Sequence, residues 1–406
     1  MSAPRTPSSQ PGAAELRLQW GLDQDVTFLN HGSFGACPTA VLALQDELRA
    51  RMEREPVHFF VHQLEPLLDA ARAEVAAFVG ADPDELAFVR NATVGVNSVL
   101  RSLELTADDE LLTTDQSYNA CRNVLDHVAG RCGARVVTVE LPFPVSGPDP
   151  IVDRILAAVT PRTRLALLDH VTSPTGLILP IAELVSRLAE RGVDTLVDGA
   201  HGPGMMPLDV SAIGAAYYTG NFHKWVCAPK GAGMLHVRRD RQAGLRPAVI
   251  SHGYNSPRLR SRFHQEFDWV GTDDPTPWLC VPGALRTVGG LVPGGWPEVR
   301  ARNHALVMAG RHILCEALGV DAPAPEEMIG SLAAVPLPDG SAEPPTTALY
   351  ADPLQSALFD RHRIEVPIPP WPSPPRRLIR LSAQLYNDIG QYERLAVALR
   401  EELGPR

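Results

Sequence analysis

Long apolar segments are missing from this sequence. Its most apolar extended stretch, Trp278–Trp296, contains Arg286 and several Gly and Pro residues, whereas a membrane span needs about 18 or more consecutive apolar residues. The N-terminus is rich in Ser, Pro and Ala and has no apolar core of the kind found in signal peptides. These absences predict a cytoplasmic protein without a membrane partner.

Runs of Lys and Arg are missing as well. The chain has 37 Lys and Arg residues against 47 Asp and Glu residues, which gives a formal net charge of −10. Nucleic acids and anionic membrane surfaces attract clustered positive charge. The composition therefore argues against both as partners.

Paired cysteines are also absent. The six cysteines are isolated in the sequence: Cys37, Cys121, Cys132, Cys227, Cys280 and Cys315. Without a CxxC pair, neither a zinc knuckle nor a thioredoxin-type redox pair is predicted. His58 and His62 are four residues apart but have no carboxylate motif around them, so we expect no metal site.

The composition is that of a globular protein. Apolar residues make up 45% of the chain and charged residues 21%, which is typical of a packed rather than a disordered chain. The 406 residues predict two or three domains. We expect an N-terminal arm over residues 1–25, loose to about residue 20, a large domain over residues 26–285 and a smaller one over residues 286–406.

Short apolar strands alternate with helices through the large domain. Helices are expected from Pro38 and over Leu64–Val79, the second ending at Gly80. Seven strands are expected at Leu86–Val89, Glu110–Thr113, Val136–Val139, Leu165–Asp169, Thr195–Val197, Ala215–Thr219 and Gly233–Val237. Helices between them include Val94–Leu103, Ala120–Ala129, Ile151–Val159 and Ile181–Glu190. This alternation predicts the α/β class, with a parallel sheet covered on both faces.

The alternation of strands and helices ends after about Pro282. The expected elements are a helix over Trp296–Leu318, a Pro-rich stretch over Ala322–Pro345, a helix near Leu354–His362, a strand over Leu378–Ser382 and a helix over Tyr392–Leu403. This order predicts a smaller C-terminal α+β domain.

Polar motifs follow three of the predicted strands, where ligands bind in open parallel sheets. Asn91-Ala92-Thr93 forms a strand-to-helix turn that suits a phosphate, although a plain Asn/Thr helix cap is the simpler explanation of that turn alone. The Asp198–His201 segment places a carboxylate at the sheet edge, or is an ordinary Asp-Gly turn.

The third motif is Asn221–Trp225. Lys224 lies between His223 and Trp225 and is expected to be partly enclosed. Enclosure lowers the pKa of an ammonium group, which suits an amine that forms a Schiff base. The alternative is a surface lysine that lies along a Trp ring.

Together, the order and spacing of these motifs resemble pyridoxal-phosphate enzymes of the class V aminotransferase group, and more narrowly the isopenicillin N epimerase-like branch. The resemblance covers about residues 26–400. Its matching segments are Leu29–Gly35, Asn91–Thr93, Asp169–Gly176, Asp198–His201, His223–Trp225, Gly271–Thr272 and Arg380–Asn387. It implies the fold type I architecture, in which a large domain with a mostly parallel seven-stranded sheet precedes a smaller α+β domain. It also implies pyridoxal 5′-phosphate as cofactor and a homodimer with a shared active site.

The resemblance further implies which residues hold the cofactor ring. Lys224 would carry the cofactor as a Schiff base, and Asp198 would pair with the pyridine nitrogen. His201 would lie near the ring hydroxyl, and Tyr118 would stack on the ring.

Phosphate and substrate contacts are implied in the same way. The phosphate would be held by Thr93, the amides of Ala92 and Thr93, His223 and Asn221. Thr272 would reach the phosphate of the neighbouring subunit. Arg380 would bind the substrate α-carboxylate through a bidentate fork that Lys could not reproduce. Asn30, His31 and Ser33 would lie near the substrate.

Two departures from the family pattern stand out. Many relatives have Ser-Gly where this chain has Asn221-Phe222, and an Asn amide can still donate to a phosphate. Cysteine desulfurases of this class use a cysteine on a mobile loop of the smaller domain, and Ala322–Pro345 contains none. Cys315 lies in a predicted helix, so a persulfide-forming desulfurase is not expected.

The motifs leave the reaction open. Lys224, once displaced by the substrate amine, can take the Cα proton. Epimerisation then needs a second acid, for which Tyr118, His31 and His252 are candidates. Loss of a leaving group gives C–S lysis, and reprotonation at the cofactor carbon gives transamination. The resemblance favours an epimerase or racemase acting on an amino-acid moiety, ahead of a C–S lyase such as a desulfhydrase, an aminotransferase or decarboxylative condensing enzyme, and a non-enzymatic binding module.

One further segment is expected to shape the pocket, together with the Pro-rich stretch. The His252–Phe267 segment contains Tyr254, Arg258, Arg260 and Arg262. These arginines predict a substrate with an additional carboxylate, and solvated loop charges are the alternative.

Overall fold

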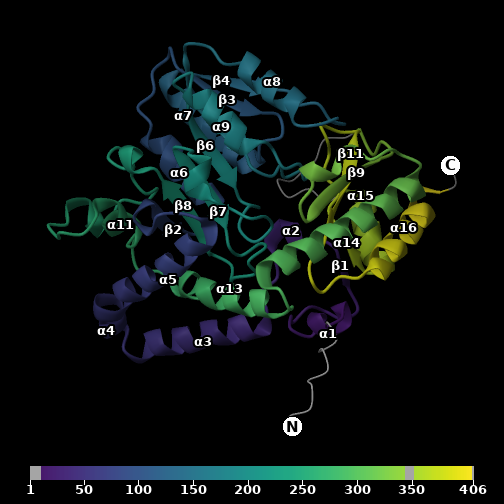
Figure 1. Cartoon of the computed structure of the whole chain (residues 1–406), viewed down its shortest axis with the longest axis horizontal. Coiled ribbons are helices and arrows are strands. Elements are labelled where there is room, and N and C mark those ends of the chain that lie inside the picture. Colours follow the sequence, from purple (N-terminus) through teal and green to yellow (C-terminus); the bar gives the residue numbers. More distant parts are fainter. Residues whose placement is uncertain (1–10, 343–351, 405–406) are drawn as a thin grey trace, which may run out of the picture.

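The computed structural model describes residues 11–342 and 352–404. Its centre is a seven-stranded sheet with the strand order β2-β8-β7-β6-β5-β3-β4 (Figure 1). The strands are β2 (Leu86–Val89), β3 (Glu110–Thr114), β4 (Arg135–Val139), β5 (Thr163–Asp169), β6 (Asp194–Gly199), β7 (Tyr217–Asn221) and β8 (Gly233–Val237). Only β8 runs antiparallel to its neighbours in this sheet. The predicted mostly parallel seven-stranded sheet is confirmed.

Apolar side chains bury both faces of the sheet. Along β5, Ala166 and Leu168 belong to one buried cluster, and Leu165 and Leu167 belong to the other. Successive side chains of a strand point to opposite faces, so the continuous apolar run follows from double burial. One face is covered by α5 (Leu64–Val79), α8 (Asp149–Ala157) and α9 (Ile181–Ala189), and the other by α6 (Ala92–Ser102) and α7 (Asn119–Cys132).

Helices near the N-terminus pack beside this sheet. The helix α3 (Thr39–Arg54) begins after Pro38, and α5 ends at Gly80, whose φ of 64° is the left-handed conformation that Gly adopts at helix ends. Both helices contact α13 (Val281–Gly290). Shorter helical segments are α1 (Ala13–Arg17), α2 (His31–Phe34), α4 (Pro56–His58), η1 (Phe59–Gln63), α10 (Val210–Ile213), α11 (Arg262–Phe267) and α12 (Thr276–Leu279).

The C-terminal part is an α+β layer. It comprises α14 (Gly295–Leu318), β9 (Leu332–Leu337), α15 (Pro353–His362), β10 (Ile364–Glu365), β11 (Arg377–Ser382) and α16 (Ile389–Leu403). The sequence predicted no strand within Ala322–Pro345, and β9 is the correction. Pro336 is tolerated there because β9 is an edge strand, and its partner Leu378 donates its N–H to the Pro369 carbonyl instead. Residues 343–345 of the predicted Pro-rich stretch lie outside the described residues.

The N-terminal segment joins the two parts of the chain. The short strand β1 (Thr27–Phe28) pairs in parallel with β10. Leu16 and Trp20 are buried, and the Trp20 ring lies 5.0 Å from the Tyr386 ring. The predicted looseness is therefore wrong for residues 11–20, because these two apolar side chains pack against the C-terminal part. No helix in the described ranges is both long and apolar enough to cross a bilayer.

Candidate active site

A cavity of about 200 Å³ lies where the predicted motifs meet, at the carboxyl ends of the parallel strands. Nine of the predicted site residues line it: Ser33, Ala92, Thr93, Tyr118, Asp198, His201, Asn221, His223 and Lys224. Four other predicted residues do not: Asn30, His31, Thr272 and Arg380. Sheet topology thus gathers side chains that are up to about two hundred positions apart in the sequence.

Lys224 is partly buried and lies in the loop after β7. Burial lowers the pKa of its amine to about 7, and the nearby Arg380 lowers it further than burial alone would. Its Nζ lies 2.9 Å from His201 Nε2. The amine is therefore substantially uncharged at neutral pH, as a nucleophile or base requires.

The loop that carries Lys224 is held by its backbone. The Cys227 N–H donates to the Lys224 carbonyl over 3.0 Å, and Cys227 itself has a φ of 60°, a strained value for a residue with a side chain. Gly35 also approaches this loop so closely that a Cβ there would collide with the His223 carbonyl. The positive φ of Gly35 and this close approach both require glycine.

The catalytic and substrate-binding roles predicted for His31 are wrong. Its ring is fully buried, with Nε2 at 3.0 Å from the Lys224 carbonyl and Nδ1 at 2.7 Å from the Tyr386 hydroxyl. A carbonyl only accepts, so Nε2 carries the proton and Nδ1 accepts from Tyr386. Burial lowers the pKa of His31 to about 3. His31 is a neutral support for the Lys224 backbone and is not among the residues that line the cavity.

Asp198 lies at the carboxyl end of β6 and is held from two sides. The Ala200 N–H donates to Oδ1 over 3.0 Å, and the Cys121 thiol donates to Oδ2 over 3.1 Å. Cys121 lies on α7, and nothing in its sequence context distinguishes it from an ordinary buried thiol. These contacts aim the carboxylate into the cavity as predicted for a partner of the pyridine nitrogen.

A second carboxyl group, Asp169, was not predicted to have a role. It pairs in register with Asp198 on the adjacent strand and lines the same cavity. Burial and the charge of Asp198 raise the pKa of Asp169 well above its usual range. Asp169 therefore binds a proton more readily than an ordinary carboxyl group does. Its position at the end of a predicted strand was a signal that could have identified it.

The predicted phosphate turn caps α6, but two of the predicted phosphate donors, the Ala92 N–H and His223, already have other partners. Asn91 Oδ1 accepts from the Val94 N–H, and the Ala92 N–H donates to Asn221 Oδ1 over 2.8 Å. His223 donates from Nδ1 to the Ala232 carbonyl over 3.1 Å, and burial lowers its pKa to about 4. Neutral His223 then presents a lone pair at Nε2, so it cannot donate to a phosphate in this form.

Thr93 is the phosphate ligand that the geometry favours. Its N–H is in the first turn of α6, where backbone donors lack intrahelical partners. Within residues 11–342 and 352–404, neither this N–H nor the Thr93 hydroxyl has a hydrogen-bond partner. Both point to an anion at the positive end of the helix.

Arg380 is buried close to Lys224. One terminal nitrogen donates to the Ser173 carbonyl over 2.6 Å, the other donates to Ser33 Oγ over 2.9 Å, and Nε has no partner among the residues that the structure describes. Ser33 in turn donates to Asn30 Oδ1 over 2.5 Å, so Asn30 supports the substrate side through Ser33. No carboxylate in the described part of the chain pairs with Arg380, and burial lowers its pKa to about 10. A buried guanidinium without a counter-ion fits the predicted substrate carboxylate.

Three other predicted residues are more exposed or lie outside the cavity. Tyr118 precedes α7 at the cavity wall, with 46% of its surface exposed, and partial burial raises the pKa of its phenol. Thr272 is exposed and outside the cavity. His252 lines a different cavity of about 660 Å³, together with Arg258, Arg260 and Trp269. Of the three second-acid candidates, only Tyr118 lines the cavity that contains the Lys224 amine.

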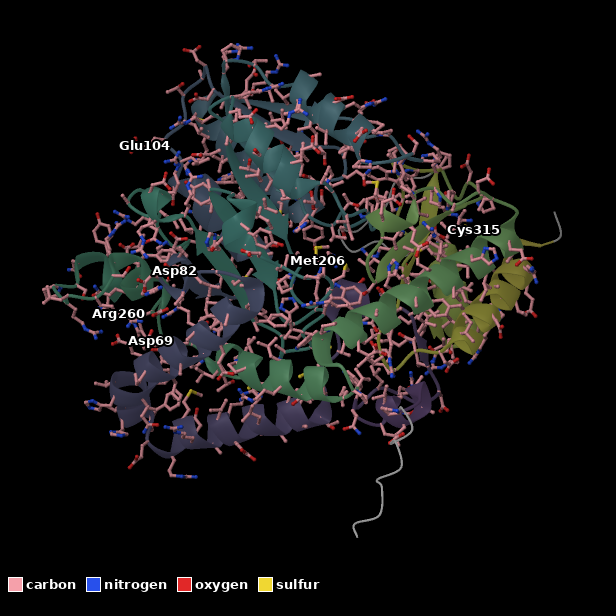
Figure 2. All side chains as sticks on the ribbon, in the orientation of Figure 1. Asp69, Asp82, Glu104, Met206, Arg260 and Cys315 are labelled. Carbon is pink, nitrogen blue, oxygen red and sulfur yellow. The ribbon has the colours of Figure 1, made fainter. Side chains whose placement is uncertain are left out.

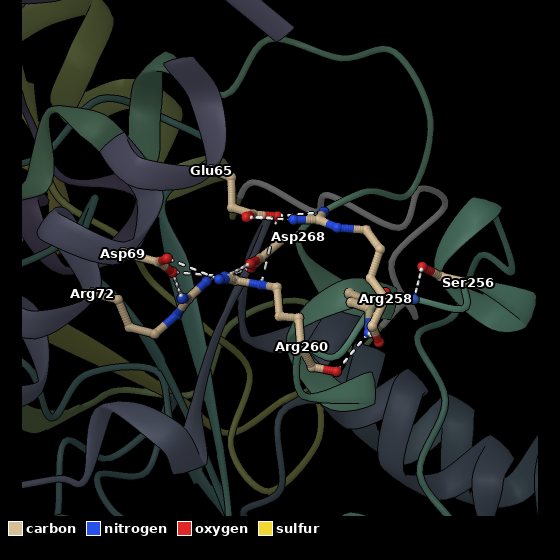
Figure 3. Close-up of polar contacts among 8 residues, drawn as sticks. Glu65, Asp69, Arg72, Ser256, Arg258, Arg260 and Asp268 are labelled. Atoms are coloured by element: carbon tan, nitrogen blue, oxygen red, sulfur yellow. Dashed lines mark hydrogen bonds and ion pairs between the residues drawn. The ribbon is translucent and has the colours of Figure 1, made fainter. Parts of the chain in front are cut away.

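The arginines of His252–Phe267 are already paired with carboxylates of the protein, and Figure 3 shows this for Arg258 and Arg260. Arg258 makes two hydrogen bonds of 2.7 Å to Glu65, and Arg260 pairs with Asp69 and Asp268. Arg262 pairs with Glu266 over 3.3 Å. The prediction of an additional carboxylate site is wrong, because carboxylates of the protein already neutralise these side chains.

Figure 2 places Arg260 and Asp69 toward one end of the molecule and Cys315 toward the other.

The residues present fit pyridoxal 5′-phosphate. The cavity combines an amine with a lowered pKa, a fixed carboxylate and a helix N-terminus with an unpartnered Thr93. Cys315 lies within α14 and packs in the apolar core, as predicted. It is therefore poorly placed to receive sulfur.

The chain is similar to several known proteins. A family model described as aminotransferase class-V matches residues 27–269. An isopenicillin N epimerase of Amycolatopsis lactamdurans is 40% identical over 403 residues, which cover 96% of this chain and 98% of the relative. A probable chloroplastic L-cysteine desulfhydrase of Arabidopsis thaliana is 33% identical over 398 residues, covering 93% of this chain and 83% of the relative. A solved structure of a C-DES variant with glycine covalently linked to its PLP cofactor has a TM-score of 0.77 at 22% identity, covering 94% of this chain and 98% of that chain. This last likeness concerns the fold alone.

Proposed function

This chain belongs to the class-V aminotransferase family of pyridoxal 5′-phosphate enzymes, and we propose that it is an epimerase that inverts the Cα of an amino-acid moiety, as in isopenicillin N epimerase. The observation that carries this proposal is that Lys224 and Tyr118 line one cavity. Two groups that can each move a proton are what inversion at one carbon needs. The 40% identity to an epimerase over nearly the whole chain supports the same reaction.

The cofactor supplies the electron-withdrawing ring that acidifies the substrate Cα–H. Asp198 holds a negative charge at the cavity, and its hydrogen bonds from Ala200 and Cys121 keep it in place. Thr93 offers its N–H and hydroxyl to the phosphate. Arg380 orients the substrate by its carboxylate, because it is preorganised by Ser33 and Ser173.

Lys224 and Tyr118 divide the proton transfers. The Lys224 amine has its pKa lowered to about 7 by burial, so it accepts a proton at Nζ near neutral pH. The Tyr118 phenol has a raised pKa and keeps its proton, so it can return one at Oη. In the reverse direction, the same two groups exchange roles.

A C–S lyase is the second candidate. Relatives named as L-cysteine desulfhydrases cover most of this chain at 33% identity. Such a reaction would use Lys224, Asp198 and Arg380 in the same way and would not need Tyr118 to return a proton.

Two wider features complete the proposal. We propose a homodimer in which Thr272, which is exposed outside its own cavity, reaches the neighbouring active site. We also propose a cytoplasmic location. Sedimentation of the holoenzyme tests the dimer, and loss of bound cofactor in Thr272→Val without dissociation tests the contribution of Thr272.

The reaction is tested with L- and D-amino acids and aminoacyl peptides in deuterated water. An epimerase places deuterium at Cα and interconverts the two configurations, without keto acid, ammonia or sulfide. Release of pyruvate, ammonia and sulfide from cysteine would instead identify the lyase.

A Tyr118→Phe variant sharpens this test. Lys224 should still exchange the Cα proton with solvent, but configuration should be retained because no second group returns a proton. Tyr254→Phe is the matched control, since Tyr254 is 60% exposed and does not line the Lys224 cavity. Inversion at an undiminished rate in Tyr118→Phe would refute the role of Tyr118.

A further inference from the structure

Three side chains form a short hydrogen-bonded chain beside the cavity. His201, from the loop after β6, is buried with 3% of its surface exposed. Its Nδ1 lies 3.2 Å from Trp225 Nε1, and its Nε2 lies 2.9 Å from Lys224 Nζ. Trp225 is 1% exposed, so water cannot replace it as the partner of Nδ1.

The chemistry of Trp225 fixes where the His201 proton lies. An indole N–H donates and never accepts, so Nδ1 of His201 must present a lone pair. In a neutral imidazole the single proton is then on Nε2. A ring rotated by 180° would place carbon atoms at both contacts and lose both hydrogen bonds.

The neutral ring is the form that its surroundings favour. Burial lowers the pKa of His201 well below its usual range, and the positive charges of Lys224 and Arg380 act in the same direction. The other titratable groups that influence His201 or Lys224 are His223, His31, Asp198, Cys121 and Asp169. Neither carboxyl group hydrogen-bonds to the His201 ring.

The proton on Nε2 sets the state of the lysine. An Nε2–H that points at Lys224 Nζ can form a hydrogen bond only if Nζ accepts, and an ammonium group has no lone pair. The 2.9 Å contact therefore requires an uncharged amine. The lowered pKa of Lys224, about 7, agrees with this conclusion from geometry.

We propose that Trp225 is a positioning residue: it fixes His201 as an Nε2–H donor toward the cavity and thereby holds Lys224 as a free amine before the cofactor arrives. The inference rests on pyridoxal phosphate as the cofactor and not on the proposed epimerase reaction. Cofactor uptake joins the Lys224 nitrogen to the aldehyde carbon, and the aldehyde oxygen leaves as water with both amine hydrogens. Only the uncharged amine can begin this step.

The first test uses the cofactor-free protein. ¹⁵N shifts of the His201 ring identify which nitrogen carries the proton, and labelled lysine reports the titration of Lys224, with Lys224→Met for assignment. We expect the proton on Nε2 of His201. A proton on Nδ1 in the wild-type protein overturns the proposal, even if no variant can be purified.

The second test removes only the donor. Trp225→Phe keeps an aromatic ring but has no N–H, so the His201 proton should move to Nδ1 and Nε2 should accept from a Lys224 ammonium. We expect the pKa of Lys224 to rise by at least one unit, and the pH profile of cofactor uptake to shift upward equally. Unchanged values would overturn the proposal.

Trp278→Phe is the matched control. Trp278 is also a buried indole, 5% exposed, whose Nε1 donates to the Val89 carbonyl over 3.0 Å. It is outside the Lys224 cavity lining, so its loss should leave the His201 tautomer and the Lys224 titration unchanged. If the pKa of Lys224 shifted equally in Trp225→Phe and Trp278→Phe, general loosening of the core would explain the effect. That result would refute the proposal. A failed epimerase assay with the Nε2 proton in place would refute only the proposed reaction.

Discussion

His31 Nε2 donates to the backbone carbonyl of Lys224 over 3.0 Å, which joins the N-terminal segment to the loop that carries the reactive amine. The two residues are 193 positions apart. His31 was predicted to act on the substrate. Its hydrogen bond instead supports the backbone of Lys224 on the side away from the cavity.

We expect His31→Ala to destabilise the cofactor-free protein by about 1–3 kcal/mol, because it leaves the buried Lys224 carbonyl and Tyr386 hydroxyl without their partner. Urea unfolding measures this, and cofactor content after dialysis measures the loosening of Lys224. His31→Gln retains an N–H donor and should restore part of both. A stable His31→Ala protein that binds cofactor normally but fails in proton exchange would show that His31 is catalytic after all.

The lowered pKa of Lys224 predicts a pH-dependent stability difference. An unfolded lysine has a pKa near 10.4, so between about pH 7 and pH 10 the unfolded chain binds more protons than the folded one. The free energy of unfolding therefore rises with pH across this window. Below about pH 7 the folded state carries the full destabilisation that comes from burying the Lys224 amine.

Lys224→Met, which cannot be charged, should consequently be more stable than the cofactor-free wild type at pH 7. With a discount for partial exposure, we expect a difference of about 2–4 kcal/mol that disappears by pH 10. Urea unfolding of both proteins across this range measures it. Parallel stability curves would show that the amine is not held uncharged.

Arg380 should control substrate binding through its fork of donors. Arg380→Lys keeps the charge but not the two terminal nitrogens that Ser33 and Ser173 hold apart. For substrates with a free α-carboxylate, we expect kcat/KM to fall about 30-fold or more. This corresponds to a loss of about 2–4 kcal/mol of transition-state stabilisation. Their amides should be affected little. Arg376→Lys, at an exposed position four residues away, is the control, and a comparable loss there or for the amides would contradict this role.

The arginines of α11 and its preceding loop should affect stability and not substrate binding. Arg260 bridges Asp69 and Asp268, so Arg260→Gln should lower the free energy of unfolding by about 1–3 kcal/mol, less than for a fully buried pair. Arg258→Gln removes a more exposed pair with Glu65 and should change stability little. KM should be unaltered in both variants. A raised KM for a dicarboxylate substrate in Arg258→Gln would instead support the hypothesis that these arginines bind an additional substrate carboxylate.

The sheet and the position of Lys224 at its edge were predictable because their signals are local. Leu165–Leu168 is apolar without alternation, which already indicates burial on two faces, and β2, β8 and α5 have the predicted bounds. Asp198 and Lys224 were recognisable because each follows such a strand. The strand β9 was missed because Pro336 argues against a strand unless the strand is known to lie at an edge.

The sequence by itself determined the seven strands of the central sheet, their mostly parallel arrangement and the presence of an amine, an acid and a strand-to-helix turn along one edge. Only the tertiary structure decided the partners of these groups: His31 lies behind Lys224, Asp198 raises the pKa of Asp169 beside it, and Trp225 directs the proton of His201 toward the amine. The arginines of His252–Phe267 are neutralised in the same way, by carboxylates distant in sequence. The physical reason is that apolar patterns act between neighbours in the chain, whereas hydrogen-bond polarity and desolvation depend on partners that meet only when the chain is folded.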